Sequence, residues 1–594
     1  SNGLHSRGFQ AMARTEQLFT LLIRVENDNR LKCGLLRYWE VCTGSRLPIV
    51  YGNSWEGLGE WLEGIKEKEC YVYTEYLTQL YQFFKTTYRT EEVFYIRNRE
   101  VLFFKMGKTV FRSAALLSGE DAALLIKQNL GTRAAGLPAS EALWQAVKCE
   151  AGNRSVRSLP LTKTGYLRRK LKTAENRQRA KELMDDNTLL KYLYFSFRGG
   201  NTVCNHWRMG AVIRDVHSWD ITSAYLAAMY FCKYPITKFE RVKEPWQNMA
   251  WVAKVKIKGL LLKRYLEPAP YLAMGRRQKW SNPYTINGRV VGASEAIIYI
   301  TDIDYKIIAK QYQWESFDFL DCYQSEYGFL PVDITDLVLD LFFDKEEAKA
   351  TNAPDKEYRK SLANAIFGTC VQSPFTPMYE EYMPYPDTVS VRIARQTEAE
   401  LVAGYLDNMA VLPYQWGVWT SAHVRYWLQC EIERAGVDFI YADTDCVKAI
   451  GDYKPEPIAG LHEISYEMEG YKSTLGGWRE EPTASEFKML GPKRYCAKIG
   501  DSLDLVLSGC QKEPATKQLI EKGGLSAFNP GLVLLSCGGI VRQYNDTCLG
   551  WQRIGGEVKY IPSNTYDTVC DYTIGQVATI KEMFSKQDFV LYAN

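Results

Sequence analysis

The sequence predicts a multidomain protein of the α+β class, and three observations lead to this prediction. The chain has 594 residues, more than one hydrophobic core usually organises. Apolar, β-prone runs at 211–219 and 438–450 alternate along the chain with a helical pattern at 355–368. From about residue 484 the sequence is rich in strand formers and contains Gly-Gly pairs, which favours a small β domain at the end of the chain.

Composition limits the class of protein further. The chain is 46% hydrophobic and 24% charged, with a net charge of +3, and no stretch reaches the ~18 apolar residues of a membrane span. The fifteen cysteines are odd in number and scattered, without a Cys-x-x-Cys pair, so we expect reduced, buried thiols in a cytoplasmic protein. Five histidines without clustered ligand spacing argue against a structural zinc site. Residues 1–12 are interpreted as a cloning remnant.

The run at 211–219 reads as a strand that ends on an acidic residue, Asp220. Thr222, Ser223 and several alanines follow it, so by itself Asp220 is equally well explained as the N-cap of a helix. Whether Asp220 is a helix cap or a functional carboxylate depends on the other acids of the chain.

Asp443 and Asp445 interrupt the apolar run at 438–450. If this run is a hairpin, both side chains point to one face at its turn, because strand side chains alternate. Acids inside an apolar run are costly unless positive charge compensates them, and metal ions do so. Alone, an Asp-Thr-Asp sequence is more often an ordinary turn.

The segment 355–368 predicts a helix with Asp355 as its N-cap. Four of its side chains fall on one stripe, because they lie three or four residues apart: Lys356, Lys360, Asn364 and Phe367. Such a stripe can meet phosphates, a nascent base pair and a sugar in succession, with lysine acting as a point charge. The alternative is a solvated helix face.

Order and mutual chemistry decide between these interpretations. Nucleotidyl transfer needs carboxylates that hold two divalent metals, and a basic helix that holds a triphosphate. The predicted metal site takes Mg²⁺ or Mn²⁺, two ions, at Asp220, Ile221, Asp443 and Asp445. We therefore interpret the three segments as the palm of a polymerase.

These segments also resemble a known family. Residues 220–229, 360–368 and 441–445 are similar to motifs A, B and C of family B DNA polymerases. Residues 195–201 resemble the linker motif before motif A, and 419–426 a helix before motif C. Lys493 and Tyr495 resemble the Lys-x-Tyr motif, so the matches cover about 195–512 and point to the protein-primed branch of bacteriophages and linear plasmids.

The resemblance implies roles for particular residues. Tyr225 matches the steric gate that excludes a 2′-hydroxyl. The motif matches also imply a set of DNA contacts: Arg198, Gly199, Gly200, Lys493 and Tyr495. The long intervals between the motifs imply insertions near 240–330 and 372–414, which in this branch position the template and priming protein and close around the DNA.

A basic stretch precedes the palm. Arg154 to Lys181 contains ten lysines and arginines and one acid, Glu175. Such a concentration is typical of phosphate binding, whereas a solvated helix face mixes in more acids. We expect contact with single-stranded template through Arg168 and Arg169, beside a tyrosine that stacks on a base.

The N-terminal segment resembles the family's proofreading exonuclease but lacks its acids. Arg24 stands where the first aspartate of the Asp-x-Glu motif is expected, and only Glu26 remains. The second motif, expected near 71–78, lacks its Asn and Asp, and the strand at 109–113 lacks an acid. We expect a right-hand polymerase (palm, fingers, thumb) with an N-terminal exonuclease-like (RNase H-like) α/β domain whose site is inactive.

The expected domains follow from these matches. They are an exonuclease-like domain at 13–150, a basic connector at 151–200, palm and fingers at 201–483 and a thumb at 484–594. The fingers are expected as a helical hairpin over 333–350 and 355–368.

The sequence thus favours a monomeric DNA-directed DNA polymerase without proofreading, protein-primed and strand-displacing. Its expected partners are primer-template DNA, deoxynucleotides and a terminal (priming) protein, with no membrane. Three alternatives stay open: a primer-independent polymerase of a mobile element or defence system, a reverse transcriptase, and a catalytically silent DNA-binding protein.

Overall fold

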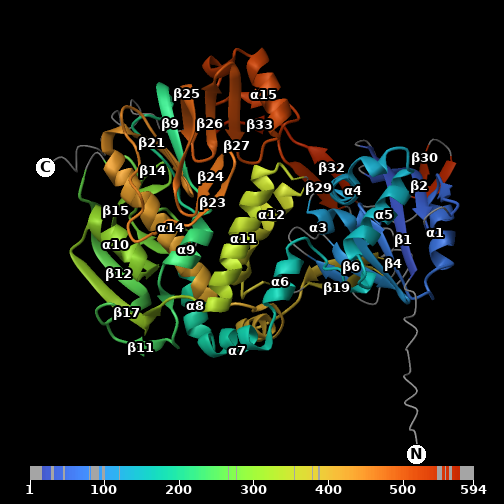
Figure 1. The fold of residues 1–594 in the computed structure, drawn as a ribbon, viewed down its shortest axis with the longest axis horizontal. Coiled ribbons are helices and arrows are strands. Elements are labelled where there is room, and N and C mark those ends of the chain that lie inside the picture. The colour runs from blue at the N-terminus through green and yellow to red at the C-terminus, as the bar shows by residue number, and fades with distance from the viewer. Residues whose placement is uncertain are drawn as a thin grey trace, which may run out of the picture. The chain divides into compact units, whose positions relative to one another are not determined.

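The structure of the chain is a computed structural model. It describes residues 17–28, 33–44, 47–78, 80–81, 93–95, 101–119, 121–264, 267–275, 277–353, 355–376, 379–385, 388–544, 551–554, 557–560 and 565–575. The chain divides into two units (Figure 1). Unit 1 takes in the chain up to Tyr166 with Met378–Ala394 and Arg542–Thr568, and unit 2 takes in the rest.

Unit 1 is built on a seven-stranded sheet in the order β3-β2-β1-β4-β7-β6-β5. Its strands are β1 Gln17–Asp28, β2 Cys33–Cys42, β3 Val50–Gly52, β4 Cys70–Thr74, β5 Val93–Tyr95, β6 Val101–Met106 and β7 Thr109–Ser113. The strands β1, β4 and β7 run parallel and the others antiparallel. Unit 1 therefore has the α/β architecture expected for the N-terminal domain.

Helices cover the sheet of unit 1. They are α1 Trp55–Glu63, α3 Ala114–Ser118, α4 Ala122–Leu130 and α5 Ala139–Ala151. Ser54 caps α1 by accepting a hydrogen bond from the Gly57 N–H at 3.1 Å, as an N-cap serine does. Alternation along β1 buries Leu21 in one apolar cluster and Leu18 in another, so the sheet has a core on each face.

Unit 2 contains the predicted palm as a second seven-stranded sheet, in the order β27-β26-β25-β9-β22-β21-β8. Its strands are β8 Thr202–Cys204, β9 Val212–Ile221, β21 Phe439–Asp443, β22 Cys446–Ala449, β25 Trp478–Gly491, β26 Arg494–Ile499 and β27 Ser502–Leu507. A thumb that starts at residue 484 would cut β25, which pairs with β9 along most of its length. The palm sheet therefore continues to Leu507, beyond the predicted boundary.

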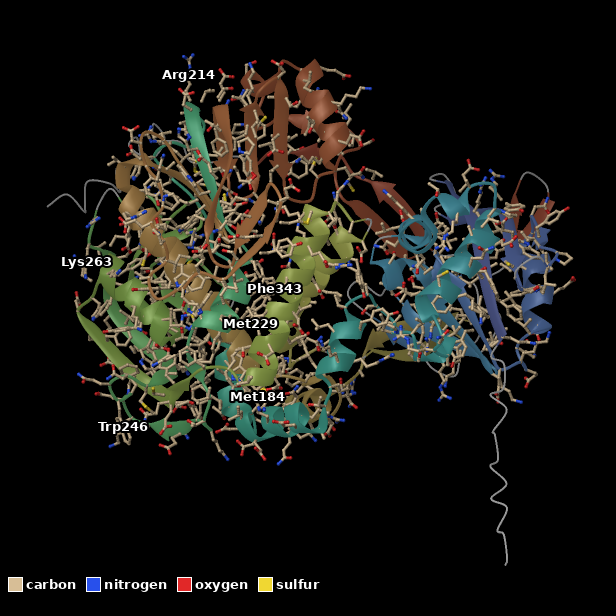
Figure 2. All side chains as sticks on the ribbon, viewed as in Figure 1. Met184, Arg214, Met229, Trp246, Lys263 and Phe343 are labelled. Carbon is tan, nitrogen blue, oxygen red and sulfur yellow. The ribbon has the colours of Figure 1, made fainter. Side chains whose placement is uncertain are left out.

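The helices of unit 2 pack into apolar cores: the last of them into a small core beside β26 and β27, and the others into one large core. They are α6 Gly165–Leu171 (which starts in unit 1), α7 Ala174–Leu183, α8 Asn187–Ser196, α9 Ala224–Phe231, α11 Val332–Ala350, α12 Lys356–Cys370, α13 Glu398–Gly404, α14 Tyr414–Ala435 and α15 Lys512–Glu521. Met184 and Met229, both labelled in Figure 2, are fully buried there. The predicted helical hairpin of the fingers is confirmed as α11 and α12, which lie side by side in Figure 1.

The first interval between the motifs forms a sheet of its own, with α10 Asp302–Gln311 packed on it and a separate apolar core. Its strands are β11 Glu240–Val242, β12 Ala250–Leu262, β13 Lys279–Ser281, β14 Tyr284–Ile286, β15 Arg289–Thr301, β16 Tyr312–Gln313 and β17 Ser316–Ser325. The second interval contains the hairpin β19 Tyr379–Tyr385 and β20 Thr388–Ile393, which belongs to unit 1.

The remaining strands are short. They are β10 Tyr234–Pro235, β18 Tyr327–Gly328, β23 Ser465–Met468, β24 Tyr471–Thr474, β28 Val533–Leu534, β29 Ile540–Tyr544, β30 Trp551–Ile554, β31 Glu557–Tyr560, β32 Thr565–Val569 and β33 Tyr572–Thr573. No helix within the described residues is both long and apolar enough to span a membrane.

Candidate active site

The palm sheet brings the first and third motifs together. β21 and β22 form the predicted hairpin, and β22 pairs with β9 so that Cys446 lies opposite Asp220. The Ile221 N–H donates to the Asp445 carbonyl oxygen at 2.8 Å, and Thr444 makes the turn with a φ of +62°. Asp220 and Asp445 therefore lie on neighbouring chain segments, although 225 residues separate them in sequence.

The carboxylates of this turn repel one another. Burial, together with the negative charges of Asp220 and Asp443, raises the pKa of Asp445 to about 6, although the positive charge of Lys345 acts in the opposite direction. Such a site is stabilised when a cation offsets the repulsion.

Asp443 is engaged differently from the other two acids. Its carboxylate accepts hydrogen bonds from Lys493 Nζ at 2.7 and 2.9 Å and from Thr202 Oγ1 at 2.8 Å. Within the described residues, no three His, Cys, Asp or Glu side chains gather closely enough to hold a metal ion. The predicted metal set is thus assembled in part, because Lys493 satisfies the charge of Asp443. Lys493, expected to contact DNA, instead forms an ion pair in this structure.

A cleft of about 1000 Å³ joins these acids to the predicted basic stripe. All of the stripe lines it, together with the three aspartates, Ile221, Tyr225, Lys493 and Tyr495. Lys360 is exposed there, and Lys356 Nζ donates to Asn352 Oδ1 at 2.8 Å. Asp355 occupies the N-cap position of α12 but makes no capping hydrogen bond, because its carboxylate pairs with Arg359 at 3.0 Å.

The sugar gate expected from the sequence is an aromatic stack. The rings of Tyr225 and Phe367 lie 4.2 Å apart with an interplanar angle of 12°. Burial, with Asp445 as the next cause, raises the pKa of Tyr225 to about 12, so its hydroxyl stays protonated. The stack forms a flat apolar wall beside the acids.

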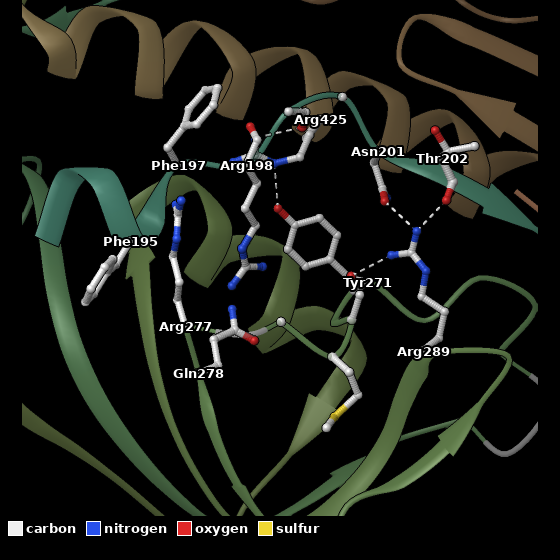
Figure 3. A pocket seen from close by; sticks show the side chains of 15 residues that line it. Phe195, Phe197, Arg198, Asn201, Thr202, Tyr271, Arg277, Gln278, Arg289 and Arg425 are labelled. Carbon is white, nitrogen blue, oxygen red and sulfur yellow. Dashed lines mark hydrogen bonds between the residues drawn. The ribbon is translucent and has the colours of Figure 1, made fainter. Parts of the chain in front are cut away.

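The linker motif packs against the turn at Thr444. A Cβ at Gly200 would lie 2.3 Å from Thr444 Oγ1, so only glycine fits there. The backbone carbonyls of Arg198 and Gly199 accept hydrogen bonds from Arg425 on α14 at 2.5 and 3.3 Å. Buried Arg425 thus hydrogen-bonds to the linker backbone (Figure 3), and Gly200 packs against the turn between Asp443 and Asp445.

Gly200→Ala should displace the Thr444 turn and lower nucleotide incorporation by roughly a hundredfold, because misplacing catalytic groups by about 1 Å has that effect. Gly199→Ala is the matched control: a Cβ there meets nothing within 4 Å, so its loss should be much smaller. Single-turnover incorporation rates for the two variants test this. Equal losses would show that the close contact does not matter.

Two side chains of the basic connector hydrogen-bond within the protein. The Arg168 guanidinium donates to the carbonyl oxygens of Asn408 and Met409, both at 3.0 Å, and burial lowers its pKa. It thus satisfies backbone acceptors at the end of a helical turn, and its contact with DNA stays a prediction. Arg169 is exposed, as a DNA contact requires. The tyrosine expected to stack on a base, Tyr166, donates its hydroxyl to Glu150 at 2.7 Å.

Sequence reasoning missed three cations of the cleft. Lys345, Lys349 and Arg479 line it, and one Arg479 nitrogen lies 3.9 Å from an Asp220 oxygen. Lys345 and Lys349 are four residues apart on the predicted helix 333–350, so their common face was detectable from spacing. Arg479 carried no such signal, because only the pairing of β25 with β9 brings it to Asp220.

The exonuclease-like unit holds few acids where a site is expected. Arg24 is exposed, and Glu26 forms an ion pair with Arg37 at 2.5 Å. Glu75, inside the expected second motif, was overlooked in the sequence: burial and the nearby charge of Asp121 raise its pKa. Glu75 and Asp121 therefore lie near each other within the described residues of unit 1.

No protein-family model and no curated protein matches the sequence. Solved structures do match it. Phi29 DNA polymerase complexed with primer-template DNA and incoming nucleotide substrates gives a TM-score of 0.70 at 13% identity, over 94% of this chain and 99% of that chain. The same polymerase with single-stranded DNA gives 0.68 at 13%, and its orthorhombic crystal form 0.67 at 14%, each over 94% of this chain and 100% of theirs. The predicted fold class is confirmed: this chain has the fold of a right-hand polymerase with an exonuclease-like domain.

Proposed function

We propose that this chain is a template-directed DNA polymerase. The observation that carries the proposal is the cleft that holds Asp220, on β9, and Asp445, in the adjoining turn between β21 and β22, together with the basic stripe of α12 and the Tyr225–Phe367 stack. Carboxylates, lysines and a sugar-sized aromatic wall in one cleft are the groups that nucleotidyl transfer needs. The solved structures with this fold include complexes of phi29 polymerase with primer-template DNA and nucleotides, which supports the same partners here.

We propose two divalent cations, Mg²⁺ or Mn²⁺, as the cofactors of this cleft. Hard carboxylate oxygens suit these ions. Burial and then the charge of Asp220 raise the pKa of Asp445, and bound cations would offset both effects. Asp220 and Asp445 would be the principal ligands, with Asp443 and Ile221 supporting them. When bound, such ions activate the primer 3′ oxygen and neutralise the leaving pyrophosphate. The residues of the chain hold the triphosphate at Lys356 and Lys360.

Primer extension tests the proposal. The purified protein with Mg²⁺, deoxynucleotides and a primed template should extend the primer to the end of the template. Two further reactions separate the alternatives. Products formed without a primer would favour a primer-independent polymerase, and primer extension on an RNA template would reveal reverse transcription. No extension under any condition would leave the silent DNA-binding protein as the better explanation. Protein priming and strand displacement are further parts of the proposal, supported by the resemblance and the two insertions.

Tyr225→Val should raise ribonucleotide use, because removing the ring opens space for a 2′-hydroxyl beside Phe367. A change of about 1–3 kcal/mol in discrimination is expected, which is roughly tenfold to two hundredfold. The ratio of kcat/KM for dNTP and NTP measures it. Phe367→Tyr keeps the stack and serves as the control. Unchanged discrimination in Tyr225→Val would refute the gate.

The protein should lack proofreading. Two-metal hydrolysis requires several converging carboxylates, and Glu26 is paired with Arg37 while Arg24 adds positive charge nearby. With Mg²⁺ and a 3′-mismatched primer but no nucleotides, the primer should stay intact, and Glu26→Ala should change nothing. The contrary result is removal of the mismatched nucleotide by the wild-type protein and by Asp445→Asn, with loss of that removal in Glu75→Gln or Asp121→Asn. It would show that the exonuclease is active.

A further inference from the structure

A short hairpin of unit 2 contacts the fingers helix α11 beside the catalytic cleft. The hairpin is formed by β23 and β24, and β23 packs against α11 (Figure 1). The ring of Phe343 on α11, labelled in Figure 2, has its centroid 6.5 Å from that of Tyr466 on β23. None of the sequence motifs includes this hairpin, so its role has to be inferred from its contacts.

The chain directly after the hairpin is joined to the end of the catalytic strand. The Thr222 N–H donates to the Gly477 carbonyl oxygen, and the Gly476 N–H donates to the Thr222 carbonyl oxygen, both at 2.9 Å. Thr222 follows Asp220 by two residues. The backbone that carries the hairpin is therefore fixed to the backbone that carries the first catalytic acid.

The strand β24 also contacts a buried carboxylate of α11. The Glu346 side chain is 1% exposed; one of its oxygens accepts a hydrogen bond from the Tyr471 hydroxyl at 2.5 Å, and the other pairs with Lys345 Nζ at 2.6 Å. Burial alone would raise the pKa of Glu346, but the charge of Lys345 and the hydrogen bonds from Lys345 and Tyr471 outweigh it and lower the pKa. A buried charge is stable only when it is paired and hydrogen-bonded, so Glu346 depends on both partners.

Lys345 connects this carboxylate to the catalytic cleft. Its side chain is 17% exposed and lines the cleft together with Asp445. In addition to its pairing with Glu346, Lys345 donates a hydrogen bond to Ser223 Oγ, three residues after Asp220. Because a lysine side chain is a flexible four-carbon stem, two fixed acceptors restrict where its charge lies.

We propose that the β23–β24 hairpin positions a lysine for nucleotide incorporation: Tyr471 holds Glu346, and Glu346 holds the ammonium group of Lys345 in the cleft. There Lys345 presents a positive charge to the phosphates that the reaction brings in. A cation that is oriented before the substrate arrives costs less to order on binding. Tyr471 and Glu346 are positioning residues, since neither lines the cleft, and the inference rests on the proposed polymerase function.

Tyr471→Phe tests the proposal, because it removes the hydroxyl and keeps the ring that lies 5.9 Å from Lys349 Nζ. In single-nucleotide incorporation, the KM for dNTP should rise about tenfold while kcat stays within about twofold of wild type. Tyr466→Phe is the matched control in the same hairpin: its hydroxyl donates to Met468 Sδ at 3.7 Å, so its KM should equal that of wild type. An equal KM in the two variants, or a loss confined to kcat, would overturn the proposal.

A double-mutant cycle shows whether Tyr471 acts through Lys345. Lys345→Met removes the charge and should itself raise the KM for dNTP. In that background Tyr471→Phe should raise the KM no further, because no ammonium group is left to hold. Full additivity of the two effects would show that the tyrosine acts by another route, and the proposal would then be wrong.

Chemical labelling tests the same contact without catalysis. Acetic anhydride acylates lysine amines, and peptide mass spectrometry follows each site. Lys345 should react about threefold faster or more in Tyr471→Phe than in wild type or Tyr466→Phe, because the carboxylate that holds it has lost a hydrogen bond. Lys517, an exposed lysine of α15, is the internal standard and should react equally in all three proteins. An unchanged Lys345 rate would contradict the anchoring.

Failure of this proposal can be told apart from failure of the proposed function. A wild-type protein that extends no primer refutes the polymerase, and the labelling then still decides whether the hairpin holds Lys345. A wild-type protein that extends primers with the same KM as Tyr471→Phe refutes the role of the hairpin alone. Circular dichroism of Tyr471→Phe verifies that the variant is folded.

Discussion

Asp445→Asn and Asp220→Asn should each abolish nucleotide incorporation, by roughly a thousandfold or more, while the fold and DNA binding persist. Asp220 ends β9 and Asp445 lies in the adjoining β21–β22 turn of the same cleft, and each substitution removes a negative charge that the reaction needs while keeping the shape of the side chain. Burial and the nearby charge of Asp220 raise the pKa of Asp445, so its ionised form costs free energy that a cation in the cleft would offset. Single-turnover primer extension measures the loss.

The control substitution lies on β9, the strand that carries Asp220. Asp215→Asn makes the same chemical change at an exposed position of β9, outside the cleft, and should extend primers at the wild-type rate. Extension by Asp220→Asn or Asp445→Asn at a rate near that of Asp215→Asn would reject the assignment of the active site.

Asp304→Ala should have the largest effect on stability, lowering the free energy of unfolding by about 3–5 kcal/mol. The Asp304 and Arg425 side chains are 0% and 2% exposed, and Asp304 also accepts a hydrogen bond from the Tyr271 hydroxyl. Without the carboxylate, Arg425 keeps a buried charge and no counterion. The midpoint of thermal unfolding measures the loss.

Matched variants show whether burial is the cause. Glu463→Gln breaks the exposed pair with Lys472, whose side chains are 64% and 55% exposed, and should cost less than about 1 kcal/mol. The double variant Asp304→Leu/Arg425→Met removes both buried charges and should unfold at a higher temperature than Asp304→Ala. A single variant as stable as the double variant would contradict this explanation.

The same pair predicts a pH dependence. Burial alone would raise the pKa of Asp304, but the charges of Arg425 and Arg198 outweigh it and lower the pKa to about 2. Since the folded value lies below the ordinary one, the stability contributed by the pair is present above about pH 4 and is lost as the pH falls toward 2. Asp304→Ala should therefore remove part of the acid sensitivity of wild type.

Motifs with local chemistry were predictable from the sequence. The hairpin at Asp443 and Asp445, the fingers helices and the stripe from Lys356 to Phe367 depend on spacing of two, three or four residues, and each was found where expected. The overall fold class followed from the order of the motifs.

Long-range contacts were not predictable. The pairing of Lys493 with Asp443 spans 50 residues, and the contact of Arg168 with the carbonyls of Asn408 and Met409 spans about 240. A single sequence records that a residue is charged, but only the folded chain decides whether a carboxylate, a carbonyl or a ligand satisfies that charge. The predicted start of the thumb at residue 484 falls inside β25 for the same reason, because β25 pairs with β9 and so extends the palm sheet.

The order of the palm sheet has a consequence for how this chain folds. β8 begins at Thr202 yet pairs with β21, which begins at Phe439, and β27 closes the sheet only at Leu507. During synthesis the early strands emerge before their partner strands, which lie more than two hundred residues downstream. The apolar faces of the early strands stay exposed until those partners are made. Contacts of such sequence separation slow folding and expose nascent chains to aggregation. A version truncated before residue 507 should therefore accumulate in inclusion bodies rather than retain partial activity.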